Sequence, residues 1–84
     1  MNEEQLKTLL NDALNLSELY VKVDGANVDI IAVSDDFESM SKVKRQQAIY
    51  APLNPHISSG EIHAVSIKAY TPDDWARDKK LMMP

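Results

Sequence analysis

Residues 18–33, ELYVKVDGANVDIIAV, decide the fold of this chain. Apolar and polar residues alternate over 18–23, which predicts a strand with one buried face. Asp24-Gly25 then gives a strong signal for a tight turn, because glycine adopts a positive φ without strain. The β-branched and apolar residues at 28–33 predict the returning strand. The stretch therefore predicts an antiparallel β-hairpin, around which the rest of the chain is arranged.

Helices are predicted before and after this hairpin. Apolar residues at helical spacing predict a helix over 3–14, with Asn2 as its N-terminal cap. Residues 41–50, SKVKRQQAIY, predict a second helix. Pro52 and Pro55 follow it. Because proline cannot donate to the helical hydrogen-bond ladder, we expect these prolines to interrupt the helix or to start a short new one.

The last third of the chain predicts one strand and one helix. Residues 61–70 are expected to form a third strand, and Thr-Pro-Asp-Asp at 71–74 predicts the start of a helix over 72–81. The helical crossover should place the third strand parallel to one strand of the hairpin. The predicted fold is therefore α+β, in the order α-β-β-α-(α)-β-α, with a three-stranded mixed sheet packed against helices. A single domain over 1–84 with the layout of a type II KH-like domain is expected.

Composition and charge narrow the classes of function. The net charge of the 84 residues is −4, with 9 acids against 2 bases over 1–38 and 4 acids against 7 bases over 39–84. The chain has no cysteine, which excludes disulfides and thiolate catalysis. No secretory signal or apolar run of about 20 residues is recognised, so we expect a cytoplasmic protein without a membrane span. No nucleophile–base pair, phosphate loop or zinc spacing is found, and no catalytic residue is predicted.

Two segments resemble a known protein family. The first is FESMSKVKRQQAIY at 37–50, and the second is IHAVSIKAYTP at 62–72, followed by Trp75. Together they resemble the BolA family, and the ending KAYTP with Trp75 is similar to the family's short bacterial branch. The resemblance extends over nearly the whole chain. It implies the BolA-like fold, which agrees with the element order predicted above.

The resemblance also implies a function without enzyme activity. BolA-like proteins bind a monothiol glutaredoxin and share a bridging 2Fe-2S cluster with it, in iron–sulfur trafficking or sensing. The glutaredoxin supplies cysteine sulfur with the help of glutathione, so no cofactor is expected on the isolated chain. The family's histidine ligand near the start of the last strand falls on His63. A second ligand, His or Cys, often comes from the loop between the first two strands, where this chain has Asn27 instead.

Each of these polar residues also has a structural interpretation. Taken on the residues alone, His63 is more often a partly buried structural histidine than a ligand, and the resemblance favours the ligand. Asn27 is interpreted as a turn residue that tolerates positive φ, because an amide oxygen is a poor partner for iron in a sulfide cluster. His56, the other histidine, is interpreted as a solvated loop residue, with an accessory metal ligand as the alternative.

A DNA-binding regulator of stress or acid response is the alternative function. It would use the helix at 41–50, with bases for phosphate and a glutamine for base edges. The candidate residues are Lys42, Lys44, Arg45, Gln46 and Lys68. Three bases on one helix support only a weak contact that falls steeply with salt. The same residues are also expected in a solvated helix face or in a docking surface for an acidic partner. The isolated chain is expected to be a monomer or a weak homodimer.

Overall fold

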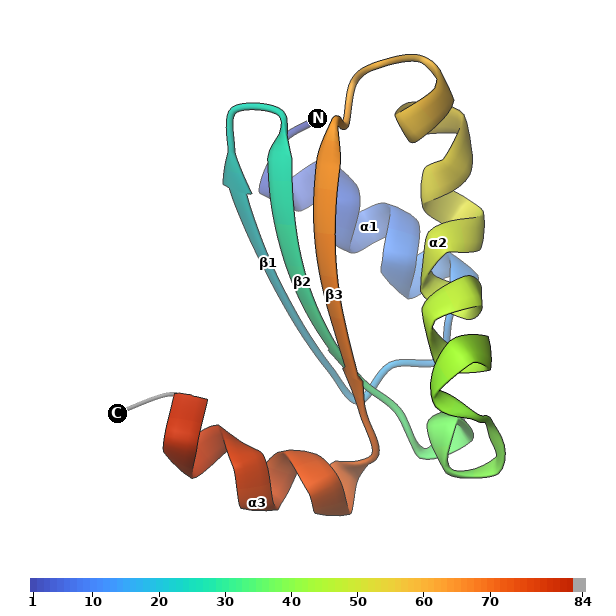
Figure 1. The fold of residues 1–84 in the computed structure, drawn as a ribbon, viewed down its shortest axis with the longest axis vertical. Helices are drawn as coiled ribbons and strands as arrows, with labels where there is room; N and C mark the ends of the chain where they lie inside the picture. The colour runs from blue at the N-terminus through green and yellow to red at the C-terminus, as the bar shows by residue number, and fades with distance from the viewer. Residues whose placement is uncertain (83–84) are drawn as a thin grey trace.

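The computed structural model describes the backbone of residues 1–82 and the side chains of residues 1–79 (Figure 1). In chain order the elements are α1 (Glu3–Ala13), β1 (Glu18–Asp24), β2 (Asn27–Val33), the 3-10 helix η1 (Asp35–Ser39), α2 (Lys42–Ser58), β3 (Ala64–Tyr70) and α3 (Pro72–Met82). Within the described part of the chain, no helix is long and apolar enough to cross a membrane.

The three strands form one mixed sheet in the order β1-β2-β3. β1 and β2 pair antiparallel through the predicted hairpin, and Gly25 takes the positive φ of 61° that its turn requires. β3 pairs with β2 in parallel, so that Val21, Ile30 and Ile67 lie side by side across the sheet. The α+β fold class and the parallel third strand are therefore confirmed.

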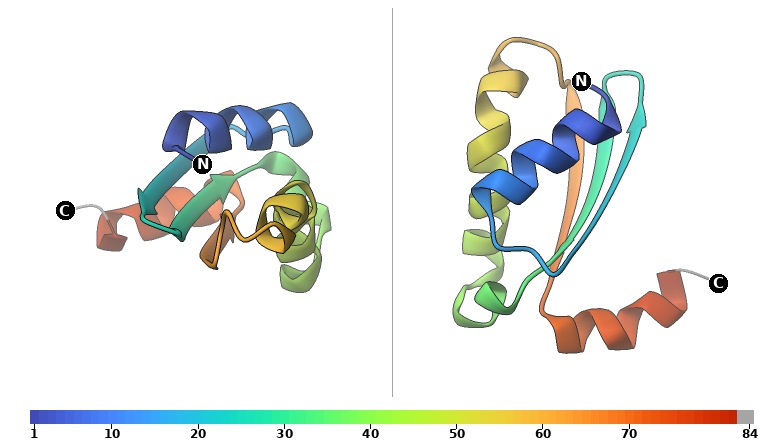
Figure 2. Two further views of the ribbon diagram at one scale, coloured as in Figure 1. Left: turned by 90° about the horizontal axis from the view of Figure 1, so that it is seen from above. Right: turned by 180° about the vertical axis from the view of Figure 1, so that it is seen from behind.

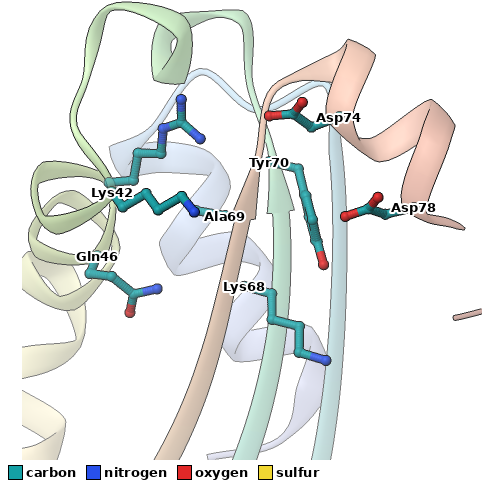
Figure 3. Close-up of a pocket in the computed structure, with 8 residues that line it drawn as sticks. Lys42, Gln46, Lys68, Ala69, Tyr70, Asp74 and Asp78 are labelled. Carbon is teal, nitrogen blue, oxygen red and sulfur yellow. The ribbon is translucent and has the colours of Figure 1, made fainter.

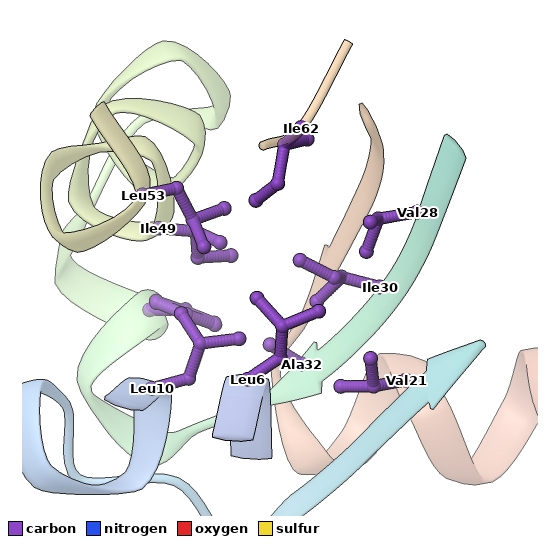
Figure 4. Close-up of a cluster of buried hydrophobic side chains, with 10 residues drawn as sticks. Leu6, Leu10, Val21, Val28, Ile30, Ala32, Ile49, Leu53 and Ile62 are labelled. Atoms are coloured by element: carbon purple, nitrogen blue, oxygen red, sulfur yellow. The ribbon is translucent and has the colours of Figure 1, made fainter. Parts of the chain in front are cut away.

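The apolar core lies between one face of the sheet and the helices α1 and α2 (Figures 2 and 4). Leucines from α1 and α2 point at the β-branched residues of the strands, because both helices present one apolar stripe to the sheet. The buried cluster consists of Leu6, Leu10, Val21, Val28, Ile30, Ala32, Phe37, Ile49, Leu53 and Ile62.

Helix α3 covers the end of the opposite face of the sheet. Trp75 is 1% exposed, and its ring lies 5.5 Å from that of Tyr20 and 5.4 Å from that of Tyr70. These tyrosines alternate with core residues along β1 and β3, so they point away from the core. The helix begins as predicted, with the Thr71 hydroxyl accepting a hydrogen bond from the Asp74 N–H at 3.3 Å. Aromatic packing thus attaches α3 to the sheet.

The prediction that Pro52 and Pro55 interrupt the second helix is wrong. Helix α2 continues through both prolines to Ser58, and no separate short helix follows it before β3. The prolines are three residues apart; Pro55 is exposed, and Pro52 is half-buried at the margin of the face that carries the buried Ile49 and Leu53. Packing of that buried side against the core outweighs the lost hydrogen bonds, since tertiary contacts supply most helical stability.

Candidate functional site

His63 lies directly before β3, beside the turn of the β1–β2 hairpin. Its main-chain N–H donates a hydrogen bond to the C=O of Ala26 at 2.9 Å, and the N–H of Ala64 reaches the same oxygen at 3.4 Å. The strand starts at Ala64 and not at 61 as predicted, so His63 precedes the alternating pattern of the strand. These bonds hold the start of β3 beside the turn of the β1–β2 hairpin, and both lie at the same end of the sheet (Figure 1).

The imidazole of His63 is exposed. No hydrogen bond or ion pair of this ring is found within the part of the chain that the structure describes. The nearest feature is Gly60, where a Cβ would lie 3.9 Å from the Nε2 atom of the ring. The interpretation of His63 as a partly buried structural histidine is therefore wrong. A neutral imidazole with unengaged nitrogens is suited to bind a metal from outside.

Asn27 lies next to His63 across the strand pair, because its register partner in β3 is Ala64. The structure thus brings together the two positions that the family resemblance connects. Asn27 is the first residue of β2 and is exposed. The interpretation of Asn27 as a turn residue is therefore wrong, and its tolerance for positive φ is not used, since among the described residues only glycines have positive φ. The extended backbone reflects the hairpin geometry, in which Asp24 pairs directly with Asn27.

The described residues contain no group of three or more His, Cys, Asp or Glu side chains that could hold a metal ion. Iron–sulfur clusters are held mainly by cysteine thiolates, and this chain has no cysteine. Thiolate ligands for such a cluster would therefore have to come from a second molecule. From this chain, the exposed imidazole of His63 is the more accessible nitrogen ligand, because Nδ1 of His56 lies against Glu61.

The other histidine, His56, belongs to the last turn of α2 and is half-buried. Its Nδ1 atom lies 3.1 Å from Oε1 of Glu61. The interpretation of His56 as a solvated loop residue is therefore wrong. The hydrogen bond from His56 is the main cause that lowers the pKa of the Glu61 carboxyl, and the Ser59 hydroxyl contributes to the lowering.

A second candidate site is a cavity of about 380 Å³ at the other end of β3 (Figure 3). It brings together four of the five residues predicted to contact DNA. The lining residues are Lys42, Arg45, Gln46, Lys68, Ala69, Tyr70, Asp74 and Asp78. Lys44, the fifth, is exposed outside this cavity.

Two of these four side chains already make hydrogen bonds within the fold. The Nε atom of Arg45 donates to the main-chain oxygens of Phe37 at 2.8 Å and Met40 at 3.2 Å. The side-chain amide of Gln46 donates to the main-chain oxygen of Ile67 at 3.0 Å. These contacts hold α2 to η1 and to β3, and they reduce what Arg45 and Gln46 can offer to a nucleic acid.

The cavity also carries negative charge. Asp74 and Asp78 project into it from α3, opposite Lys42 on α2 (Figure 3). A phosphate placed there would meet carboxylates as well as ammonium groups, and like charges at close range oppose binding. The cavity and His63 lie at opposite ends of β3, about 20 Å apart for a strand of this length.

Comparison with known proteins identifies the family. The BolA-like protein family model matches residues 17–74. The acid stress protein IbaG of Escherichia coli is 49% identical over 81 residues, which cover 96% of each chain. The structure of a BolA homologue from Coxiella burnetii is similar with a TM-score of 0.77 and 28% identity, covering 92% of this chain and 99% of that one.

A eukaryotic structure shares the same fold. Yeast Fra2 is similar with a TM-score of 0.71 and 28% identity, covering 100% of this chain and 94% of that one. The resemblance read from residues 37–50 and 62–72 is thereby confirmed, as is the similarity to a short bacterial protein. This chain belongs to the BolA family.

Proposed function

We propose that this chain is a non-enzymatic partner protein that binds a monothiol glutaredoxin and completes a shared 2Fe-2S cluster through His63. The observation that carries the proposal is the exposed imidazole, which makes no hydrogen bond within the described residues. Its backbone is held to the hairpin by the 2.9 Å bond to Ala26. An exposed ring whose nitrogens have no partner among the described residues is open to a metal that a second molecule holds.

The chemistry of the ligands supports a shared cluster over a private one. The chain lacks cysteine, so the thiolates would come from the glutaredoxin and its glutathione. A histidine in place of a cysteine on one iron raises the reduction potential of such a cluster when it is bound. On this basis the role of the chain is to supply one exchangeable nitrogen ligand in iron–sulfur trafficking or sensing.

Asn27 lies beside this ligand and does not replace it. Its amide oxygen is a hard, neutral donor, whereas iron in a sulfide cluster favours thiolate and imidazole. His63 would therefore be the sole ligand from this chain. Introducing the usual residue by Asn27→His should add a second nitrogen near the first and lengthen the lifetime of the cluster in the mixed complex.

Co-expression with the monothiol glutaredoxin of the host tests the proposal. The purified pair should elute as a mixed complex that contains iron and absorbs visible light. His63→Ala should remove the visible spectrum of the mixed complex, while Asn27→Ala should leave it unchanged. A mixed complex that keeps its iron and its spectrum after His63→Ala would overturn the proposal. Binding of equal affinity without iron would indicate an adaptor that needs no metal.

DNA binding is a second candidate, because the exposed Lys42 and Lys68 line one cavity, although Asp74 and Asp78 in that cavity would oppose a phosphate. A relative of this chain carries the name acid stress protein, which fits a regulator of stress response. Replacing Lys42 and Lys44 by alanine should abolish a DNA mobility shift and leave the cluster spectrum intact, because both side chains are exposed near the start of α2, and the cavity that Lys42 lines lies at the opposite end of β3 from His63. An unchanged shift would exclude this surface as the DNA contact.

A further inference from the structure

Three side chains between the end of α2 and the start of β3 form one hydrogen-bonded group. His56 Nδ1 lies 3.1 Å from Oε1 of Glu61, and the Ser59 hydroxyl lies 3.2 Å from the same oxygen. The Ser59 hydroxyl also lies 3.0 Å from the main-chain oxygen of His56 and 3.4 Å from the N–H of Glu61. We name His56, Ser59 and Glu61 the α2–β3 clasp, because they close the turn that reverses the chain between these elements.

Backbone contacts connect the clasp to His63. Gly60 makes the reversal with a positive φ of 86°. The next residue but one, Ile62, is 2% exposed within the core, and its N–H donates to the main-chain oxygen of His56 at 3.2 Å. His63 then bonds to Ala26. Each residue from Ser59 to His63 is therefore held by packing, by a hydrogen bond or by the turn itself.

The imidazole lies near this turn, since a Cβ at Gly60 would be 3.9 Å from Nε2 of His63, an ordinary van der Waals distance. The position of the His63 backbone, and with it the direction of the Cα–Cβ bond, depends on the path of residues 59–62, which the clasp restrains. Groups that orient a ligand without touching the metal commonly change metal affinity 10- to 100-fold when they are removed.

We propose that the α2–β3 clasp positions His63 for the cluster of a partner protein. This inference rests on the proposed function and deepens it. His56 and Glu61 act as positioning residues: they hold the turn in one conformation, so the Cα–Cβ bond of His63 is held in one direction before the partner binds. Preorganisation of this kind lowers the entropy lost when the shared site forms.

Variants of the clasp test this inference. Glu61→Ala should shorten the lifetime of the cluster in the mixed complex by about 10-fold, while Glu61→Gln, which keeps an acceptor oxygen, should retain most of it. His56→Asn places an amide nitrogen where Nδ1 lies and should retain more than His56→Ala. Glu38→Ala is the matched control, since Glu38 is exposed and has no hydrogen bond or ion pair within the described residues.

A second measurement needs no cluster. In the isolated chain, hydrogen exchange of the His63 amide should become about 10-fold faster in Glu61→Ala and remain unchanged in Glu38→Ala, because the clasp restrains the loop that carries this amide. Equal exchange rates and equal cluster lifetimes in Glu61→Ala and the original chain would overturn the inference. This outcome would overturn the role of the clasp and leave the proposed function standing. The proposed function is tested separately, by the visible spectrum of the mixed complex with His63→Ala.

Discussion

The main-chain N–H of His63 donates to the C=O of Ala26 across 2.9 Å, and this bond joins the start of β3 to the turn of the hairpin. Because the bond is made by the backbone, it does not engage the imidazole. This one contact thus fixes the position of the His63 backbone and leaves the imidazole without a hydrogen bond. Neither neighbour in the chain has this combination, since Ile62 is buried in the core and Ala64 carries no polar side chain.

His63→Ala should change the free energy of unfolding by less than about 0.5 kcal/mol, because an exposed side chain without a hydrogen bond contributes little. Ile62→Ala, one residue earlier, should lower it by about 2–5 kcal/mol, because Ile62 belongs to the core. Urea unfolding followed by circular dichroism measures both. A loss above 1 kcal/mol for His63→Ala would show that the ring is structural after all.

Gln46→Ala should lower the free energy of unfolding by about 1 kcal/mol, since it removes the hydrogen bond to the Ile67 oxygen. β3 is an edge strand, and this bond satisfies one of its main-chain acceptors. Gln47→Ala is the matched control, because Gln47 is adjacent and exposed and should lose less than about 0.5 kcal/mol. Equal losses in the two variants would contradict the role assigned to Gln46.

The protein should lose stability at alkaline pH through Tyr20 and Tyr70. A hydrogen bond to Glu18 at 2.7 Å raises the pKa of Tyr20. Partial burial is the main cause that raises the pKa of Tyr70, and the negative charge of the nearby Asp78 is the second. A raised pKa in the folded state means that the unfolded chain ionises first, so this stability is present below pH about 10 and is lost as the pH rises beyond it.

Urea midpoints at pH values between about 7 and 11 measure this loss. Combining Tyr20→Phe with Tyr70→Phe should make the urea midpoint fall less steeply as the pH rises. Tyr50→Phe on α2 is the control, because it removes a phenol elsewhere in the fold and should leave the fall unchanged. An equally steep fall in the double variant would show that other groups cause it.

Trp75→Ala should lower the free energy of unfolding by about 3–5 kcal/mol, because it removes the ring between Tyr20 and Tyr70 that attaches α3. Trp75→Phe should lose much less. It keeps an aromatic ring and removes an indole N–H that is buried without an acceptor among the described residues. Thermal unfolding compares the two variants, and similar losses would argue that α3 does not depend on aromatic packing.

Local patterns were sufficient to predict most elements of the fold. The Asp24-Gly25 turn, the alternation over 18–23 and the Thr71 cap each depend on a few neighbouring residues, and each prediction is confirmed. The prediction that the prolines interrupt α2 is wrong because helix propensity depends on neighbouring residues alone. The packing of Ile49 and Leu53 against the sheet depends on residues far away in the sequence.

In the candidate site, too, some features follow from the sequence alone and others only from the tertiary structure. The sequence by itself determined that His63 would stand near the start of the last strand and that this chain has no cysteine thiolate to offer a metal, since both follow from residue identity and order. Only the tertiary structure decided that the ring is exposed, that Gln46 and Arg45 serve the fold, and that His56 meets Glu61. Exposure and pairing depend on which segments the folded chain brings together, and no local pattern of residues contains that information.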